Sequence, residues 1–162
     1  MNLLFRIYGF ILNSLTRLNN KALSVYKTSL IKGKHGKVSG SVTIFNPKQI
    51  SLGVNSYINS GTYLHAGDNS KIVIGDNCMI SYNVHMRTVD HIHDPNDARP
   101  MIEQGCIEKD ILIGDNVWIG YGAQILPGIT IGNLAIMLLL ELVLSLLQML
   151  KIILLLVSLH VK

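Results

Sequence analysis

The sequence predicts an all-β fold, a left-handed parallel β-helix, with a helix before it and a Leu-rich tail, expected to be helical, after it. Apolar residues recur every six positions between Val38 and Ile131. An apolar stripe at helical spacing precedes this repeat, and residues 134–162 lack Gly, Pro, Asn and Asp. The 162 residues suffice for one domain. We therefore expect three segments, 1–37, 38–133 and 134–162.

The N-terminal segment carries one apolar stripe of a helix within residues 2–30. The stripe consists of Leu4, Ile7, Ile11, Leu15 and Leu18. Such a stripe packs on its own domain more often than on a membrane, so we expect intramolecular packing. Polar residues interrupt the apolar ones and no small-residue cleavage site follows, which does not fit a signal peptide.

Positive charge is concentrated at the start of the chain, within a net charge of +4. No Asp or Glu occurs before Asp68, whereas eight Lys and Arg residues do. Such a region fits anionic lipid headgroups or an anionic glycan, with a solvated face as the alternative. We expect peripheral membrane association at most, and no nucleic-acid partner. Cys78 and Cys106 form no disulfide framework, which indicates a reducing, cytoplasmic compartment.

Four series of apolar residues share the six-residue period. They are Val38, Ile44 and Ile50; Leu52, Ile58 and Leu64; Ile74, Ile80 and Met86; and Ile113, Ile119, Ile125 and Ile131. Each hexad is interpreted as one short strand plus a tight turn, and three hexads close a triangular coil with the apolar residue inside. Coils stack and bury a shared column, as in other repeat proteins. Antiparallel strands would show a period of two instead.

The largest interruption of the repeat is a polar segment from residue 87 to residue 110. It contains Asp90, His91, His93 and Asp94. A long polar loop that leaves a regular solenoid is usually functional. We therefore expect a protruding functional loop here.

Three runs of the sequence resemble the hexapeptide acetyltransferases. They are Ile74-Gly-Asp-Asn-Cys-Met-Ile80, Ile113-Gly-Asp-Asn-Val-Trp-Ile-Gly120 and Ile125-Leu-Pro-Gly-Ile-Thr-Ile-Gly132. The nearest in style are maltose and galactoside acetyltransferases and the sugar O-acetyltransferases of polysaccharide biosynthesis. The resemblance covers residues 38–133. It implies a homotrimer, acetyl-CoA as donor, a sugar or glycan acceptor, and active sites between neighbouring subunits.

The resemblance also implies site residues. A catalytic His at the start of the loop falls on His91, and Asn83 lies near the acceptor. Trp118, with Gly120 and Ala123, is expected near the donor.

Acyl transfer to a hydroxyl needs a base, and His suits this role because its pKa lies near neutrality. Asp90 or Asp94 could orient the ring, and Asn83 or backbone amides could stabilise the oxyanion. No Ser-His-Asp arrangement is evident, so direct transfer from the thioester is the simpler mechanism.

Several alternatives stay open at this point. His93 competes with His91 as the base, Trp118 could simply cap the outside of a coil, and Asn83 could be only a turn residue. The histidines, with His65 and His85, also invite comparison with the γ-class carbonic anhydrases, which hold zinc by three His on this fold. The spacing of that family is missing, so we expect no metal.

The tail departs from the family pattern, because Gly-rich hexads and a closing Pro-Ala-Lys or Pro-Ala-Arg are absent after Asn133. Its length would span a bilayer, but Glu141 and Lys151 are costly at a membrane centre. We prefer a frameshift near codon 133, since a shifted frame can encode Gly-Val-Pro-Ala-Arg at the end.

The lost coils would remove much of the donor pocket. We therefore expect weak activity, or an inactive remnant of a damaged gene, and no further six-residue coils in the tail.

Overall fold

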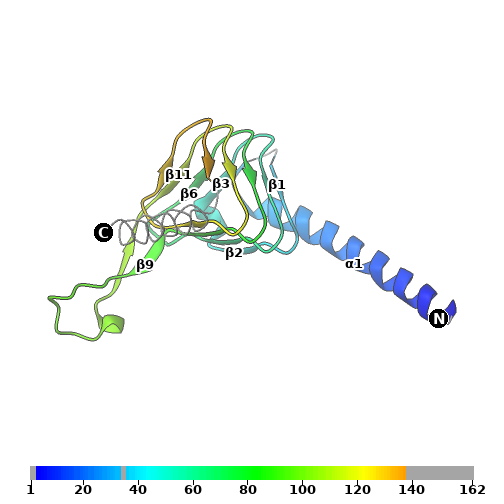
Figure 1. Ribbon diagram of the computed structural model, residues 1–162, viewed down its shortest axis with the longest axis horizontal. Helices are drawn as coiled ribbons and strands as arrows, with labels where there is room; N and C mark the ends of the chain where they lie inside the picture. Colours follow the sequence, from blue (N-terminus) through cyan, green and yellow to red (C-terminus); the bar gives the residue numbers. More distant parts are fainter. Residues whose placement is uncertain (1–2, 34–35, 138–162) are drawn as a thin grey trace, which may run out of the picture.

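The computed structural model describes residues 3–33 and 36–137, in which one long helix leads into a stack of coils (Figure 1). The helix, α1, spans Leu3–Leu30, within the range expected from the sequence. No helix in these two ranges is both long and apolar enough to cross a bilayer.

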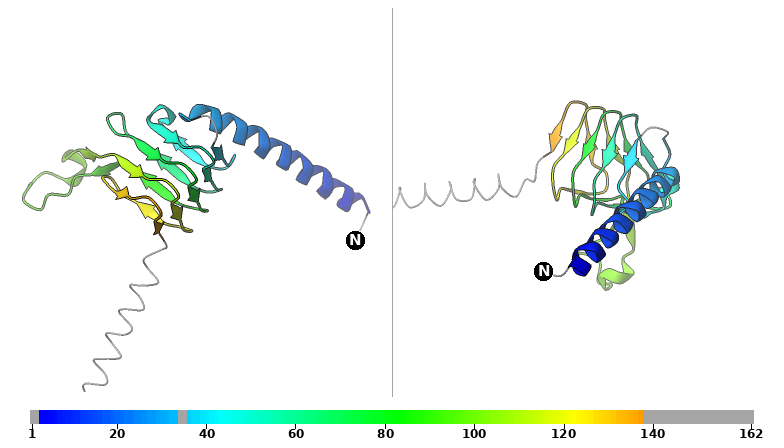
Figure 2. Two further views of the ribbon diagram at one scale, coloured as in Figure 1. Left: turned by 90° about the horizontal axis from the view of Figure 1, so that it is seen from above. Right: turned by 90° about the vertical axis from the view of Figure 1, so that its right-hand side faces the viewer.

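Three parallel sheets form the walls of the coil. Sheet I comprises β1 (Lys37–Val38), β4 (Tyr57–Ile58), β7 (Met79–Ile80), β12 (Trp118–Ile119) and β15 (Ile136–Met137). Sheet II comprises β2 (Thr43–Phe45), β5 (Tyr63–His65), β8 (His85–Arg87) and β13 (Gln124–Ile125). Sheet III comprises β3 (Ile50–Leu52), β6 (Ile72–Ile74), β11 (Ile111–Ile113) and β14 (Thr130–Ile131). The chain visits the three sheets in turn, so the expected parallel β-helix is confirmed (Figure 2).

The six-residue repeat forms the core of the coil. Every residue of the four apolar series is buried except Ile44, which is partly buried. The register of the parallel strands stacks these residues in columns, with Ile58 beside Ile80 and Ile80 beside Ile119. Because burial of such a side chain contributes about 1.5–3 kcal/mol, these columns dominate the stability of the coil.

The corners require unusual backbone angles. At the corner between sheets III and I, Asn55, Asn77 and Asn116 have φ of 60°, 56° and 56°. Asn tolerates this left-handed region better than most residues do. Leu134 occupies the same corner one coil later with φ of 61°, where a bulky side chain is strained.

The coil extends past Asn133, the end expected from the sequence. Strand β15 pairs with β12, with Ile136 beside Trp118 and Met137 beside Ile119. The six-residue series therefore continues from Ile131 to Met137, which corrects the expectation that no coil continues after Leu134. The rest of the expected helical tail, residues 138–162, lies outside the described residues.

The segment from residue 87 to residue 110 is an antiparallel hairpin rather than an irregular loop. Strands β9 (Val89–His91) and β10 (Cys106–Glu108) pair, and the short helix η2 (Met101–Glu103) lies near its tip. The hairpin leaves the corner between sheets II and III, and a second short helix, η1 (Pro47–Gln49), lies at the same corner two coils earlier. The hairpin projects away from the coil (Figure 1).

Helix α1 does not pack its apolar stripe on the coil, which corrects the expectation from the sequence. The five stripe residues are between 48% and 70% exposed, and no residue of α1 is buried. Polar side chains attach the helix instead. Thr28 Oγ1 accepts the Val38 N–H at 3.0 Å, Ser24 donates to the Val38 carbonyl, and Lys27 donates to the Val42 carbonyl.

Candidate functional site

His91 lies at the end of strand β9, directly opposite Cys106 on strand β10. Both residues are exposed, and the imidazole Nδ1 lies 3.6 Å from the Cys106 sulfur. In the tautomer in which Nδ1 donates to the sulfur, Nε2 keeps its lone pair free. Sequence reasoning missed the contact of Cys106 with His91, because no motif marks Cys106 and its pairing with His91 depends on the register of the hairpin.

Asp90 supports the strand that carries His91 rather than the imidazole. One carboxylate oxygen lies 3.1 Å from the Arg87 guanidinium, and the other accepts the His91 N–H at 3.0 Å. The hydrogen bond from Arg87, followed by that from His91, lowers the pKa of Asp90. Asp94 accepts the N–H of Asn96 within its own turn. Neither carboxylate hydrogen-bonds to the imidazole ring in the part of the chain that the structure describes, and a role of Asp90 or Asp94 in orienting the ring stays a prediction.

The base of the hairpin is fastened to the turn 66–70 of the preceding coil. Thr88 Oγ1 accepts the Gly67 N–H at 2.8 Å and lies 2.6 Å from the Ser70 hydroxyl. From the other hairpin strand, Glu108 accepts the Asn69 N–H at 2.8 Å and the Ser70 hydroxyl at 3.1 Å. Thr88 and Ser70 are buried, so water does not compete for the bonds that join Thr88 to Gly67 and Ser70. This clamp sets the position of His91, three residues after Thr88.

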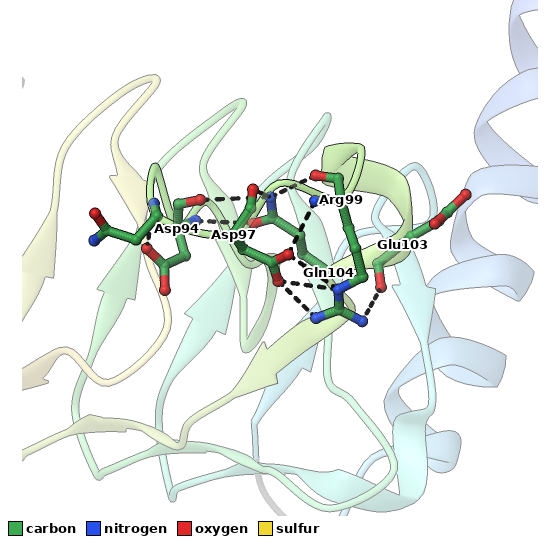
Figure 3. Close-up of polar contacts among 6 residues, drawn as sticks. Asp94, Asp97, Arg99, Glu103 and Gln104 are labelled. Atoms are coloured by element: carbon green, nitrogen blue, oxygen red, sulfur yellow. Dashed lines mark hydrogen bonds and ion pairs between the residues drawn. The ribbon is translucent and has the colours of Figure 1, made fainter.

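The tip of the hairpin is organised around the buried side chain of Gln104 (Figure 3). Its amide oxygen accepts the Asp94 N–H at 2.9 Å, and its amide nitrogen donates to the Arg99 carbonyl at 3.0 Å. Arg99 also pairs with Asp97, at 2.6 Å, and lowers the pKa of that carboxyl. The hairpin is therefore held by its own hydrogen bonds as well as by its base.

Asn83 occupies the corner between sheets I and II. Its φ is 56°, so it does serve as a turn residue. Its exposed side-chain amide donates to the Tyr121 hydroxyl at 2.9 Å, in the next coil. The contact of Asn83 with an acceptor stays a prediction.

Trp118 lies on the outer surface of sheet I, between Met79 and Ile136. It is 40% exposed and borders an apolar hollow of about 230 Å³. Gly120 is buried in the following turn. Ala123 is 4% exposed, and its carbonyl accepts the His85 N–H at 2.9 Å. The Ala123 side chain therefore points into the core, and any contact with a donor would have to come from its backbone.

The expected base and the expected donor residue lie on opposite sides of one chain. His91 belongs to a hairpin that leaves the corner between sheets II and III, whereas Trp118 lies on sheet I. In a three-sided coil, the corner between sheets II and III lies opposite sheet I, so His91 and Trp118 face away from each other. A site that uses both residues therefore needs a second copy of the chain.

His65 and His85 belong to an aromatic ladder on the outside of sheet II. The rings of Tyr63 and His85 are 4.5 Å apart, and those of Phe45 and His65 are 5.4 Å apart. Burial, and then the positive charges of Arg87 and His65, lower the pKa of His85. Within residues 3–33 and 36–137, no three His, Cys, Asp or Glu side chains are placed to hold a metal ion.

Comparison with known proteins identifies several acetyltransferases as relatives. The chain is 33% identical to the galactoside O-acetyltransferase of Escherichia coli, over 66% of this chain and 53% of that protein. Among solved structures, a maltose O-acetyltransferase of Clostridium difficile is 33% identical, with a TM-score of 0.58, over 81% of this chain and 72% of that one. A hexapeptide-repeat acetyltransferase of Vibrio cholerae, complexed with acetyl coenzyme A, is 28% identical, with a TM-score of 0.58, over 68% and 58%.

The relatives differ from this chain in length. The chain spans about half the length of the curated relatives that it matches. No protein-family model matches it.

Proposed function

This chain belongs to the hexapeptide-repeat acetyltransferase family, and on that premise we propose that it is an O-acetyltransferase. It moves an acetyl group from acetyl-CoA to a hydroxyl of a sugar or glycan, such as a polysaccharide precursor. The observation that carries this proposal is the placement of the exposed His91 on a clamped hairpin, with its Nδ1 3.6 Å from the Cys106 sulfur. From the family we also infer the left-handed sense of the coil.

His91 acts as the general base in this proposal. Its Nε2 takes the proton of the acceptor hydroxyl while the oxygen attacks the thioester carbonyl. The tetrahedral intermediate carries a negative oxygen, which the amide of Asn83 or backbone N–H groups stabilise. Collapse of the intermediate breaks the carbon–sulfur bond, and His91 returns the proton to the CoA sulfur. The acetyl ester and free CoA are the products.

The complete site forms between neighbouring copies of a homotrimer. The opposite positions of His91 and Trp118 on one chain support this arrangement, since two copies can bring the two together. Trp118 of one subunit would then lie at the donor while His91 of the next faces the acceptor.

We further propose that this chain is weakly active. The sequence after Met137 contains no Gly-bearing hexads of the kind with which the family continues, and this departure from the family pattern supports the proposal. A folded but inactive chain is the alternative, and the same Leu-rich composition favours it.

The experiment is an acetyl-CoA assay on a panel of sugars, with release of the CoA thiol as the readout. His91→Ala should lower kcat/KM about a hundredfold or more, the usual contribution of a general base. His93→Ala, in the same hairpin, is the matched control and should leave the rate unchanged. Equal rates for wild type and His91→Ala refute the assignment of the base. A folded chain with no activity on any acceptor supports the inactive alternative.

A further inference from the structure

We propose that helix α1 is an amphipathic arm that docks this protein on an anionic lipid surface. This interaction is separate from the proposed acetyl transfer and does not depend on it. Three features of α1 carry the proposal: its exposed apolar side, its attachment to the coil, and its charge.

The apolar side of α1 is continuous and exposed. Ile7, Ile11, Leu15 and Leu18 follow one another at spacings of three and four residues, and their exposed fractions lie between 48% and 65%. Aromatic side chains flank this stripe, with Phe5 72% and Tyr8 61% exposed. A contiguous exposed apolar surface marks an interaction site.

The attachment of α1 prevents this side from folding back on the coil. Ser24, Lys27 and Thr28, on the other side of the helix, hold the backbone of the first coil at Val38 and Val42. After the helix, Ile31 is buried and Lys32 pairs with Ser51, so the junction is fixed. The helix projects away from the coil along its whole N-terminal half (Figures 1 and 2).

The charge of α1 selects the partner. The helix contains Arg6, Arg17, Lys21 and Lys27 and no acidic residue, and the first acidic residue of the chain is Asp68. Lys21 borders the apolar stripe, whereas Arg6 and Arg17 lie on the opposite, polar side of the helix. Apolar side chains bordered by cations match the boundary between acyl chains and anionic headgroups. A second copy of the helix would oppose like charges, which disfavours self-association.

Vesicle flotation of the full chain tests the proposal. Wild type should float with vesicles that contain phosphatidylserine, sink with pure phosphatidylcholine, and bind less as salt rises. Arg17→Gln should lower the partition coefficient about fivefold, the equivalent of about 1 kcal/mol for one cation. Ile11→Asp with Leu15→Asp should lower it about a hundredfold, since burial of each side chain is worth about tenfold or more.

The matched control is Ile102→Asp, which changes an apolar residue that is 85% exposed on the hairpin and should not affect flotation. Residues 134–162 are the same in every variant, so their contribution to vesicle binding is the same in every comparison. Because the α1 residues are exposed, their substitution leaves the coil folded. Flotation that is unchanged in the double variant, or equal on both lipids, overturns the proposal. Loss of oligomers in the double variant, with no vesicle binding by wild type, overturns it in favour of self-association.

Discussion

Replacement of Thr88 by Val isolates the clamp at the base of the hairpin. Val matches Thr in shape, so the substitution removes the hydroxyl without leaving a cavity. The Gly67 N–H, now 2.8 Å from Thr88 Oγ1, loses its acceptor in a buried position. The Ser70 hydroxyl, 2.6 Å from the same oxygen, loses one of its two side-chain partners and keeps Glu108.

The magnitude follows from these two losses. A buried donor left without an acceptor costs about 1–3 kcal/mol, and an ordinary hydrogen bond contributes about 0.5–1.5 kcal/mol. Thr88→Val should therefore lower the free energy of unfolding by about 1.5–4.5 kcal/mol. Because Thr88 stands three residues before His91, the acetyl-transfer rate should fall as well.

Urea unfolding and the acetyl-CoA assay measure the two effects. Ser56→Ala is the control, since the buried Ser56 hydroxyl donates to the Gly75 carbonyl at 2.7 Å and accepts the Cys78 N–H at 2.8 Å. It lies at the corner between sheets III and I, away from the hairpin, so it should cost similar stability but preserve the rate of the folded protein. A stability loss below about 0.5 kcal/mol for Thr88→Val would refute the reasoning.

Four further predictions concern single side chains. Cys106→Ala should lower kcat/KM about two- to fivefold, the worth of one weak hydrogen bond, and Cys106→Ser should restore it. Iodoacetamide should inhibit wild type through Cys106 alone, because Cys78 is buried and burial raises its thiol pKa; inhibition that persists in Cys106→Ser contradicts this. The hydrogen bond from Arg87 lowers the pKa of Asp90 in the folded protein. The ionised Asp90 carboxylate therefore stabilises the fold fully above the ordinary Asp pKa of about 3.9, and this stabilisation is lost as pH falls through the folded pKa. The Tm of Asp90→Asn should accordingly change less than that of wild type as pH is lowered. Leu134→Asn should raise the free energy of unfolding by about 1 kcal/mol by relieving a left-handed backbone, and no gain would argue that Leu134 is unstrained.

Leu134 also bears on the origin of the tail. It stands at the corner position that Asn occupies at residues 55, 77 and 116 of the earlier coils. The frameshift hypothesis stays a prediction, and the nucleotide sequence tests it. The alternative frame should encode Gly-rich hexads and a Pro-Ala-Arg ending, and a stop codon there would end the hypothesis.

The sequence by itself determined the coil. A period of six places each apolar residue inside a three-sided prism, and this pattern is local, so it can be read from one chain. The polar interruption between residues 87 and 110 marked the position of the hairpin for the same reason. Strand β15 was missed because Ile136 and Met137 stand within a Leu-rich segment whose composition hides the repeat.

Only the tertiary structure decided which contacts the hairpin makes and which side of helix α1 faces the coil. The contact between His91 and Cys106 depends on hairpin register, and the bonds from Thr88 to Gly67 and Ser70 join residues about twenty positions apart. The apolar stripe on α1 could be predicted from the sequence, but the fact that it faces away from the coil could not. Periodicity shows which residues share a side of the helix. Which side faces the coil depends on the Val38 and Val42 carbonyls, which accept hydrogen bonds from α1 only after the first coil has formed.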